Sequence, residues 1–349
     1  MPERLRVVVA TPLPPRLARY MAERESRLEL VHERRLLPAM RYPADHAGDP
    51  SFHRTPEQQA EFDSLLDSAD ALYGVPDSDS SALRRTAEAN SRLRWVHTMA
   101  AGGGGQVKAA ELSEELLQRI QFTTSAGVHS KPLAEFALFG LLAGAKNLDR
   151  LQHQQRHREW TDRWMMGQLA EQTILVVGLG GIGRRVAEVL AALGATVVGT
   201  SRREISVPGV DRVVHPDDLV KVAGEVDGVV VTLPGTDATH NMLGHGFFGA
   251  LRLGATVVNV GRGTVIDEDA LVTALNSGVV GFAALDVFAT EPLPPNSALW
   301  GMDNVIVSPH TSALSVNEDR LIADVFLENA ARLLDGQELL NVVDTVEFY

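Results

Sequence analysis

Three polar side chains with complementary chemistry, Arg262, Glu291 and His310, follow three apolar runs late in the chain. An arginine guanidinium can hold a carboxylate through two parallel hydrogen bonds. A histidine imidazole can exchange a proton near neutral pH, and a glutamate that accepts a hydrogen bond from it orients the ring and favours its charged form. An anion clamp, a proton donor and a partner for that donor are what hydride transfer to a small carboxylic acid requires.

A glycine-rich turn gives the second chemical signal. The run Val176–Gly183 reads G-x-G-x-x-G between a predicted strand and a predicted helix. Gly178 allows a tight turn, Gly180 lets the backbone approach a pyrophosphate, and Gly183 lets the helix pack on the strand. The amides at the helix start attract phosphate. The phosphate-binding residues predicted here are Gly178, Gly180, Gly181, Ile182 and Gly183.

The end of the next predicted strand bears on cofactor choice. Folds that prefer NAD usually carry Asp or Glu there for the ribose hydroxyls, but this chain has Ser201, Arg202 and Arg203. A serine with two arginines suits the extra phosphate of NADP, which a carboxylate would repel. The alternative is an NAD enzyme in which one arginine stacks on the adenine. The sequence predicts NADP as the preferred cofactor, with NAD as the alternative.

Composition limits the other partners. The 349 residues are 45% hydrophobic and 22% charged, with a net charge of −13, and they include no cysteine. The negative charge argues against nucleic acid as a partner, and the lack of cysteine excludes disulfides and thiolate metal ligands. No apolar run reaches the length of a membrane span, and the N-terminus lacks a signal-peptide pattern. We therefore expect a soluble cytoplasmic protein without a membrane partner.

Alternating apolar runs and helical patterns predict an α/β protein with two Rossmann-like, doubly wound parallel sheets. The first domain, flavodoxin-like and discontinuous, is expected at 1–126 and 317–349, with the nucleotide-binding domain at 127–316. Long helices are expected at Lys131–Gln155 and Asn317–Leu334, and the segment Leu339–Tyr349 is expected to return to the first domain. The residues 36–61 are predicted to form a long loop leading into a helix, with a lid or an interface arm as its interpretation. The expected strands are Leu5–Thr11, Leu28–His32, Ala71–Gly74, Leu93–Thr98, Ile120–Thr124, Thr173–Gly178, Thr196–Thr200, Val213–His215, Gly228–Thr232, Thr256–Val260, Gly281–Asp286 and Val305–Val307.

Several motifs together resemble the D-isomer-specific 2-hydroxyacid dehydrogenase family, over about Leu93 to Asn341. The segments that carry the resemblance are Leu93–Gly102, Gly127–Val128, Ala134–Phe136, Leu233–Pro234, Asn259–Gly263, Asp286–Val287, Glu291–Pro292 and Ser308–His310, beside the glycine motif. The resemblance is specific because these blocks match in order. It departs at the glycine run 102–105, where an acidic residue often follows the motif; a flexible turn or a tuned substrate loop would each explain the run.

The resemblance implies a role for each matching residue. Arg262 would be the substrate clamp, Glu291 the histidine partner, and His310 the acid that protonates the carbonyl oxygen. The amides of Ala101 and Gly102 would hold the substrate carboxylate. The remaining residues implied to line the cofactor site are Leu233, Val260, Gly261 and Asp286, with Asp286 holding the nicotinamide amide and His310 beside the ring. The implied activity interconverts a small 2-keto acid, such as glyoxylate or hydroxypyruvate, with its D-2-hydroxy acid, in a homodimer built on the nucleotide domain.

Other interpretations of these residues stay open. Arg262 and Glu291 could form a structural ion pair, His310 could be a turn histidine, and Asp286 could cap a loop. For the whole chain, the alternatives are a non-catalytic, nucleotide-responsive binding protein and a dehydrogenase of a phosphorylated 2-hydroxy acid, for which Arg54 or Lys108 would supply a cation. A further enzyme alternative acts in the oxidising direction on an inorganic acid or on formate. The formate type fits poorly, because family members that oxidise formate carry Gln where Glu291 stands.

Two further patterns have simple interpretations. His153 and His157 have the i, i+4 spacing of a metal pair, but Gln and Arg surround them, so a solvated helix face is predicted and no metal site. Glu318 and Asp319 lie near a predicted helix start, where negative charge is favourable.

Overall fold

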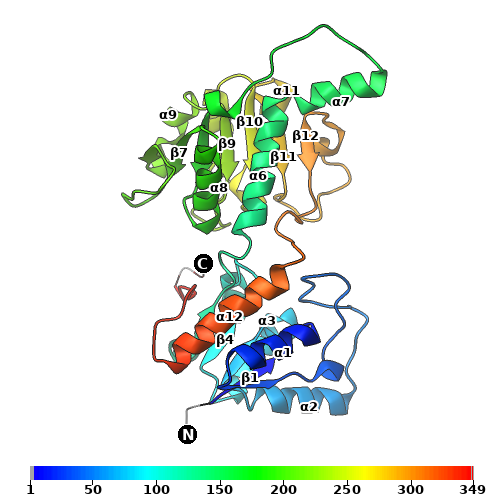
Figure 1. The fold of residues 1–349 in the computed structure, drawn as a ribbon, viewed down its shortest axis with the longest axis vertical. Helices are drawn as coiled ribbons and strands as arrows, with labels where there is room; N and C mark the ends of the chain where they lie inside the picture. The colour runs from blue at the N-terminus through cyan, green and yellow to red at the C-terminus, as the bar shows by residue number, and fades with distance from the viewer. Residues whose placement is uncertain (1–3, 347, 349) are drawn as a thin grey trace. The chain divides into compact units, whose positions relative to one another are not determined.

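The computed structural model describes residues 4–346 and 348. The chain divides into two compact units, Met1–His129 with Leu314–Tyr349, and Ser130–Ala313 (Figure 1). The first unit is thus made from two separate stretches of sequence. The crossings lie at 129/130 and 313/314, whereas the sequence pattern predicts them at 126/127 and 316/317.

Unit 1 is built on a parallel sheet of five strands in the order β2-β1-β3-β4-β5. This is the order of flavodoxin-like folds, as the sequence predicts. The strands are β1 (Leu5–Val9), β2 (Leu28–Val31), β3 (Ala71–Tyr73), β4 (Trp95–His97) and β5 (Gln121–Thr123). The helices are α1 (Pro15–Arg24), η1 (Arg34–Leu36), α2 (Pro56–Leu66), η2 (Pro76–Ser78), α3 (Ser80–Ala89), α4 (Gly104–Ala109), α5 (Glu114–Arg119) and α12 (Glu318–Leu334).

Helix α12 closes the core of unit 1, although it comes nearly 200 residues after the strands. It lies beside α1 on one face of the sheet (Figure 1). Its buried Phe326 stacks on Trp95, with ring centroids 4.5 Å apart, and meets Tyr73 edge-on at 5.1 Å. Beyond α12, Val342 forms an antiparallel bridge with Thr123 of β5. The segment predicted to return to this domain does so in its described part, and Glu347 and Tyr349 lie outside the described residues.

Unit 2 is built on a parallel sheet of seven strands in the order β12-β11-β10-β9-β6-β7-β8. The strand order reverses direction at β6, so the carboxyl ends of β6 and β9 flank the switch point at which such folds bind nucleotides. The strands are β6 (Thr173–Val177), β7 (Thr196–Thr200), β8 (Arg212–Val214), β9 (Gly228–Val231), β10 (Ala255–Asn259), β11 (Val280–Leu285) and β12 (Val305–Val307). The predicted doubly wound α/β class is confirmed in both units.

Helices cover both faces of the unit 2 sheet. Its helices are α6 (Ser130–Ala145), α7 (Leu148–His157), η3 (Leu169–Glu171), α8 (Gly181–Ala192), η4 (Pro216–Asp218), α9 (Leu219–Ala223), α10 (His245–Ala250), η5 (Gly263–Val265), α11 (Glu268–Asn276) and η6 (Ala298–Gly301). The small residues of α6 let it lie close to the sheet: a Cβ at Gly140 would approach the Cβ of Ala284 to 2.7 Å. Among residues 4–346 and 348, no helix is both long and apolar enough to cross a membrane.

The single helix predicted over Lys131–Gln155 is wrong. The structure has two helices there, α6 and α7, separated at Lys146 and Asn147. Asn147 adopts a left-handed backbone (φ 52°), which an asparagine tolerates better than most residues and which ends a right-handed helix. The apolar pattern of α6 also stops there, because α7 has no buried residue.

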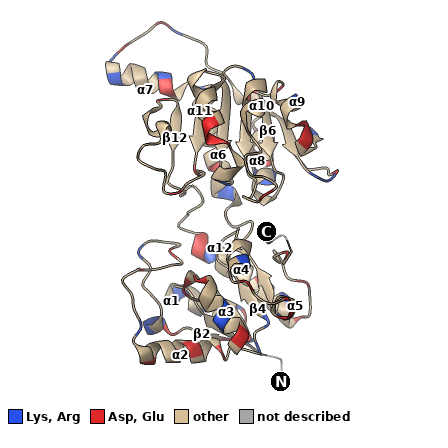
Figure 2. Ribbon diagram, turned by 180° about the vertical axis from the view of Figure 1, so that it is seen from behind, with Lys and Arg blue, Asp and Glu red and all other residues tan. Residues whose placement is uncertain are grey.

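Basic and acidic residues are distributed over the ribbon of each unit (Figure 2). Acidic residues are interspersed with arginines along α12, and exposed pairs such as Arg332 with Glu328 link residues on that helix. Such surface pairs contribute little to stability individually.

Candidate active site

The glycine turn lies between β6 and α8, where the sequence places it. Gly178 has φ +102°, and a Cβ on Gly183 would come within 1.9 Å of the carbonyl oxygen of Gly178. Both positions therefore require glycine. A Cβ at Gly180, in contrast, would meet no atom within 4 Å, so the backbone is open on that side. The turn has the approachable backbone that a pyrophosphate needs.

A buried hydroxyl beside this turn has no partner. Ser130 Oγ is buried and unbonded among the described residues, and it lies 3.5 Å from the Cβ position of Gly181. Leu233 covers the other side, since a Cβ on Gly178 would lie 2.7 Å from Leu233 Cδ2. A buried polar atom without a hydrogen bond is costly unless a ligand or water satisfies it. The surroundings of the turn therefore fit a phosphate-bearing cofactor.

A pocket of about 470 Å³ lies at the end of β7. Ser201, Arg202 and Arg203 line it, together with Arg212 and His215 from the β8 region. The Ser201 hydroxyl accepts a hydrogen bond from the backbone amide of Arg203 at 3.1 Å, which orders the start of this loop. The acidic residues that also line the pocket are Glu204 and Asp211, and the latter accepts from the amide of Val197 at 2.7 Å. The pocket is thus lined by more cationic than anionic side chains.

Arg262 follows β10 and is held at its backbone by the last residue of that strand. The side chain of Asn259, buried, donates to the carbonyl oxygen of Arg262 at 3.1 Å and accepts from the amide of Gly261 at 3.0 Å. The exposed guanidinium donates from Nη1 to the carbonyl of Gly261 at 2.8 Å. The amide of Val260 donates to the carbonyl of Val231 at 3.0 Å, and a Cβ on Gly261 would approach the carbonyl oxygen of Leu233, in the loop after β9, to 2.6 Å. The loops after β9 and β10 are in close backbone contact.

Glu291 and His310 form a hydrogen-bonded pair in the loops after β11 and β12. Nδ1 of His310 and Oε2 of Glu291 are 2.7 Å apart, and both side chains are partly exposed. The other carboxylate oxygen of Glu291 accepts from the amide of Phe288 at 3.0 Å, which fixes the carboxylate. With Nδ1 committed to Glu291, the imidazole presents Nε2, which bonds to no described residue, for proton exchange. Within the described chain, Arg262 and Glu291 form no ion pair, so that alternative is not observed.

The three loops are interlocked. A Cβ on Gly263, directly after Arg262, would come within 1.8 Å of the carbonyl carbon of Phe288. The amide of Ala289 also donates to Glu268 of α11 at 2.6 Å. Because the loop that carries Glu291 rests on the loop that carries Arg262, unit 2 holds all three predicted catalytic side chains on a common support.

Asp286, at the end of β11, is buried and surrounded by donors from the His310 loop. Its Oδ1 accepts from Ser308 Oγ at 2.6 Å and from the amides of Thr311 and Ser312 at 3.0 Å, and its Oδ2 accepts from Ser312 Oγ at 2.5 Å. These four hydrogen bonds tie the His310 loop to the end of β11.

The comparison with known proteins decides the family. Residues 138–312 match the model of a protein family described as "D-isomer specific 2-hydroxyacid dehydrogenase, NAD binding domain". The chain belongs to this family. It is therefore an NAD(P)-dependent oxidoreductase, as the sequence predicts.

Named relatives agree with the assignment. A glyoxylate reductase of Aeropyrum pernix is 34% identical over 267 residues, which span 72% of this chain and 77% of that protein. A similar fold is seen in the crystal structure of a D-isomer specific 2-hydroxyacid dehydrogenase from Xanthobacter autotrophicus Py2, in complex with NADPH and MES. The two structures align with a TM-score of 0.77 and 28% sequence identity, and the alignment covers 99% of this chain and 100% of that one. An NADPH-dependent glyoxylate/hydroxypyruvate reductase from Sinorhizobium meliloti, in complex with NADP and sulfate, aligns with a TM-score of 0.78, 25% identity and the same coverage.

The predicted substrate-loop residues of this dehydrogenase family member lie in unit 1, between β4 and α4. The amides of Ala101 and Gly102 donate to no described residue, so both are available to an acceptor. The glycine run beyond them is not simply flexible: Gly103 packs on Thr98, whose Oγ1 would lie 1.7 Å from a Cβ there, and α4 begins at Gly104.

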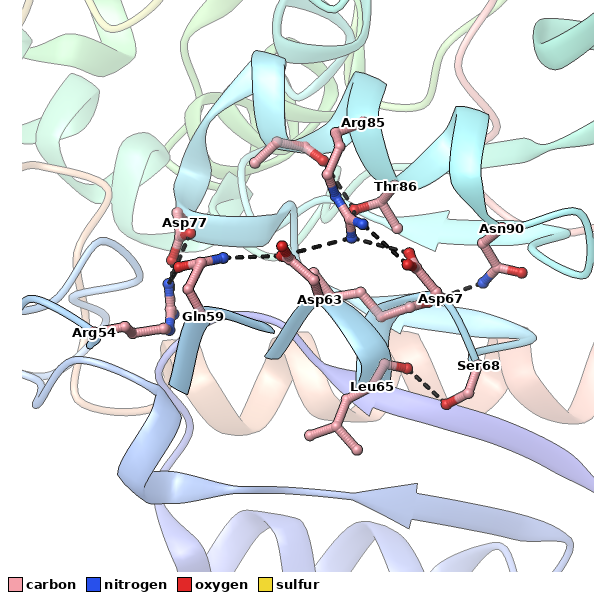
Figure 3. Close-up of polar contacts among 12 residues, drawn as sticks. Arg54, Gln59, Asp63, Leu65, Asp67, Ser68, Asp77, Arg85, Thr86 and Asn90 are labelled. Atoms are coloured by element: carbon pink, nitrogen blue, oxygen red, sulfur yellow. Dashed lines mark hydrogen bonds and ion pairs between the residues drawn. The ribbon is translucent and has the colours of Figure 1, made fainter. Parts of the chain in front are cut away.

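Arg54 is not a free cation for a phosphorylated substrate. Its guanidinium forms two hydrogen bonds with the Asp77 carboxylate, at 2.9 and 3.0 Å (Figure 3). The guanidinium lies 3.8 Å from the ring centroid of Phe62. It also donates to the carbonyl of Leu36 at 2.7 Å. Arg54 thus fastens the segment after η1 to the loop after β3, and its role is structural.

The histidine pair on α7 is also structural in this geometry. The rings of His153 and His157 stack with centroids 4.1 Å apart, and Nδ1 of His157 bonds to the carbonyl of His153 at 2.8 Å. No group of metal-ligating side chains that could hold an ion occurs in the described part of the chain.

Sequence reasoning missed four residues that support the site or the fold around it. Asn259 is the last residue of the largely apolar strand β10. A polar side chain at the end of an apolar run is visible in the sequence and could have indicated this residue. Ser308 and Ser312 flank His310, and only the position of Asp286 shows what they bind. His129 pairs with Glu318, 189 residues away, and no local pattern announces that contact.

Proposed function

We propose that this protein reduces a small 2-keto acid, of the glyoxylate or hydroxypyruvate type, to its D-2-hydroxy acid, with NADPH as the preferred donor. The observation that carries the proposal is the Glu291–His310 hydrogen bond at 2.7 Å, on loops interlocked with the one that bears Arg262. These residues follow adjacent parallel strands, and ligands of such sheets bind at the carboxyl ends of their strands.

The cofactor would be held by the glycine turn and the pocket after β7. The amides near Gly180 and Gly181 would meet the pyrophosphate, and Ser130 Oγ offers a donor beside them. Ile182, Gly183 and Leu233 would shape the apolar side of this site, while Val260, Gly261 and Asp286 would border the nicotinamide. When bound, the reduced cofactor supplies a hydride to the substrate's carbonyl carbon.

The protein's own residues provide charge and a proton. We propose that Nε2 of the His310 imidazolium donates the proton that the carbonyl oxygen needs, and that Glu291 stabilises the imidazolium at Nδ1. Arg262 would leave its contact with the Gly261 carbonyl and hold the substrate carboxylate bidentately. In unit 1, the free amides of Ala101 and Gly102 are proposed carboxylate donors.

The NADPH preference rests on Ser201, Arg202 and Arg203. The two similar structures from Xanthobacter autotrophicus Py2 and Sinorhizobium meliloti are complexes with NADPH and NADP, which supports the same choice here. In the Ser201→Asp variant, a carboxylate would face the extra phosphate, and we expect the ratio of kcat/KM for NADPH over NADH to fall by about tenfold or more, equivalent to about 1.4 kcal/mol. A wild-type enzyme that favours NADH would refute the preference.

We also propose a homodimer built on unit 2. Large apolar side chains are exposed there, including Phe139 at 47%, Trp160 at 102% and Met165 at 96%. Exposed apolar side chains on this scale favour a protein partner. Light scattering on the purified protein would show one copy or two. The predicted cytoplasmic location would be tested separately by cell fractionation.

The function is tested by following NADPH and NADH absorbance with glyoxylate, hydroxypyruvate, pyruvate and bulkier 2-keto acids. Turnover of one or more small 2-keto acids is expected, and the ranking would give the pocket size. Turnover only with phosphorylated substrates would favour the phosphorylated 2-hydroxy acid alternative. No turnover with intact cofactor binding would refute the reductase and favour the non-catalytic binding protein.

A further inference from the structure

We propose that Ser308 and Ser312 are positioning residues that act through Asp286 to hold His310 in its working orientation. The inference rests on the proposed function, because it concerns the acid of that reaction. It goes beyond it by assigning roles to two serines and a second role to Asp286.

The backbone of His310 needs an external restraint. Its φ is +52°, a left-handed conformation that is unfavourable for a residue with a side chain. The His310 amide donates to the backbone carbonyls of Asp286 and Ser308, both at 3.0 Å. Strain of this kind persists only where the surroundings over-determine the conformation. The Asp286 backbone supplies one of these restraints.

The Asp286 side chain supplies the others. Its carboxylate is 1% exposed and accepts four hydrogen bonds, all from residues on either side of His310. Ser308 lies two residues before the histidine, and Thr311 and Ser312 lie directly after it. The carboxylate therefore ties both ends of this short turn to the end of β11. No described cation pairs with Asp286, so these donors alone stabilise its buried charge.

The division of bonds between the two oxygens leaves room for a second partner. Oδ1 accepts three of the four hydrogen bonds, and Oδ2 accepts only that of Ser312 Oγ at 2.5 Å. Oδ2 therefore accepts two hydrogen bonds fewer than Oδ1, which leaves Oδ2 as the oxygen for the nicotinamide amide proposed above. Asp286 would then join the cofactor's reactive end to the loop of the acid.

The two serines have a specific part in this arrangement. The amides of Thr311 and Ser312 are backbone groups and survive any side-chain change, whereas the two hydroxyl donors do not. If both serines are replaced by alanine, the carboxylate keeps two of its four donors, and Oδ2 loses its only one. We expect the turn to loosen and the Nδ1 contact of His310 with Glu291 to become less populated.

The test compares the double variant Ser308→Ala/Ser312→Ala with the wild type and with two kinds of control. The conservative variant Ser308→Thr/Ser312→Thr keeps both hydroxyls. Ser277→Ala removes a serine hydroxyl that bonds only to the Ala274 carbonyl, at 3.1 Å, at the end of α11. For the double alanine variant we expect kcat to fall on the order of 10- to 100-fold, as a small misplacement of a catalytic group does. KM for the keto acid and Kd for NADPH should change by less than about threefold, and the control variants should keep kcat within about threefold.

A second readout does not depend on turnover. The Nδ1 proton of His310, held by Glu291, should give a protected imidazole NMR signal, assigned by its loss in His310→Asn. The signal should disappear or exchange faster in the double alanine variant and remain in the threonine variant. If the double variant does not fold, the two single alanine variants carry the same comparison.

The outcomes separate this inference from the proposed function. A double alanine variant that keeps both kcat and the Nδ1 signal overturns the inference, whatever its melting temperature. A wild type without 2-keto acid turnover overturns the proposed function instead, and the NMR comparison alone then decides whether the serines position His310. An equal fall of kcat in Ser277→Ala would also overturn the inference, because the effect would not be specific to Asp286.

Discussion

A buried carboxylate in unit 1 provides the sharpest stability prediction. Glu318 opens α12, is 4% exposed, and accepts a hydrogen bond from Nε2 of His129 at 3.0 Å. Nε2 of His46 lies 3.6 Å from the same oxygen, close enough for charge attraction although too far for a good hydrogen bond. Burial of Glu318 acts to raise its pKa, but the hydrogen bond from His129 and the charge attraction of His129 and His46 outweigh it and lower the pKa to about 2.

The magnitude follows from linkage. The ordinary pKa of the group is 4.5, so a folded-state value of about 2 corresponds to about 3 kcal/mol at about 1.4 kcal/mol per unit. Because the folded pKa is the lower one, this stabilisation is complete above pH 4.5 and is lost as the pH falls toward 2. Glu318→Gln should therefore lower the free energy of unfolding at pH 7 by about 2 to 3 kcal/mol, with the smaller value reflecting the hydrogen bond that Gln still accepts.

The neighbouring acid should respond in the opposite direction. Burial, with a contribution from the charge of Glu318, raises the pKa of Asp319 above 3.8 despite the nearby His46, Arg16 and the amide of Ala44. A raised pKa means that the folded protein disfavours the charged form at neutral pH. Asp319→Asn removes that penalty and keeps an oxygen for the Ala44 amide, so we expect the free energy of unfolding at pH 7 to be unchanged or higher.

The assay is urea unfolding at several pH values between 7 and 3, followed by tryptophan fluorescence, to which Trp95, buried in unit 1 against Phe326, contributes. The matched control on the same helix is Glu328→Gln, which removes an exposed pairing with Arg332 and should change stability by less than about 0.5 kcal/mol. The deficit of Glu318→Gln should shrink as the pH falls below 4.5. A Glu318→Gln protein that matches Glu328→Gln at pH 7, or a deficit that grows in acid, would refute the reasoning.

Three predictions concern unit 2. His310→Asn should lower kcat by about 100-fold or more, as loss of a general acid does. The Kd for NADPH, measured by fluorescence, should stay within about threefold of the wild-type value. An unchanged kcat would exclude His310 as the acid. Arg262→Lys should raise KM for the keto acid by about tenfold or more, with a smaller effect on kcat, because a point charge replaces the planar guanidinium. Steady-state kinetics in which only kcat fell would contradict this prediction. Gly183→Ala should weaken NADPH binding by about tenfold or more, because its Cβ would lie 1.9 Å from the Gly178 carbonyl, whereas Gly249→Ala, with no atom within 4 Å, should bind normally. Equal binding by the two glycine variants would argue against a tight turn.

Much of the architecture was predictable from the sequence because periodicity and glycine placement act locally. The buried strands Thr173–Val177 and Thr196–Thr200 read as continuous apolar runs, as strands covered on both faces do, and lie within one residue of the expected positions. The break at Asn147 was harder to predict, because Lys146 and Asn147 do not forbid a helix by composition alone. The left-handed backbone of Asn147 and the loss of a buried face beyond Ala145 together end α6 there, and both are properties of the folded chain.

The residues of the site also fall into two groups: those that local sequence indicates and those that only the tertiary structure reveals. Arg262, Glu291 and His310 carry distinctive chemistry at strand ends, so their types and order were enough to nominate them. The structure adds the Glu291–His310 contact, while the Nε2 proton transfer stays a proposal. Asn259, Ser308 and Ser312 bear ordinary polar side chains, and their importance depends on which atoms they meet.

Glu318 shows why such residues escape a reading of the sequence. A carboxylate in the first turn of a helix is favourable at the helix dipole, and that explanation is sufficient until its burial is known. Once the carboxylate is known to be buried, the helix dipole is no longer a sufficient explanation, because a buried charge needs a partner. That partner, His129, lies 189 residues earlier in the chain. His129 is the last residue before the chain leaves unit 1, and Glu318 comes four residues after the chain has returned at Leu314. The pair therefore fastens the departing and returning segments of unit 1 to one another, which is why its removal should destabilise a domain that is assembled from two separate pieces of sequence.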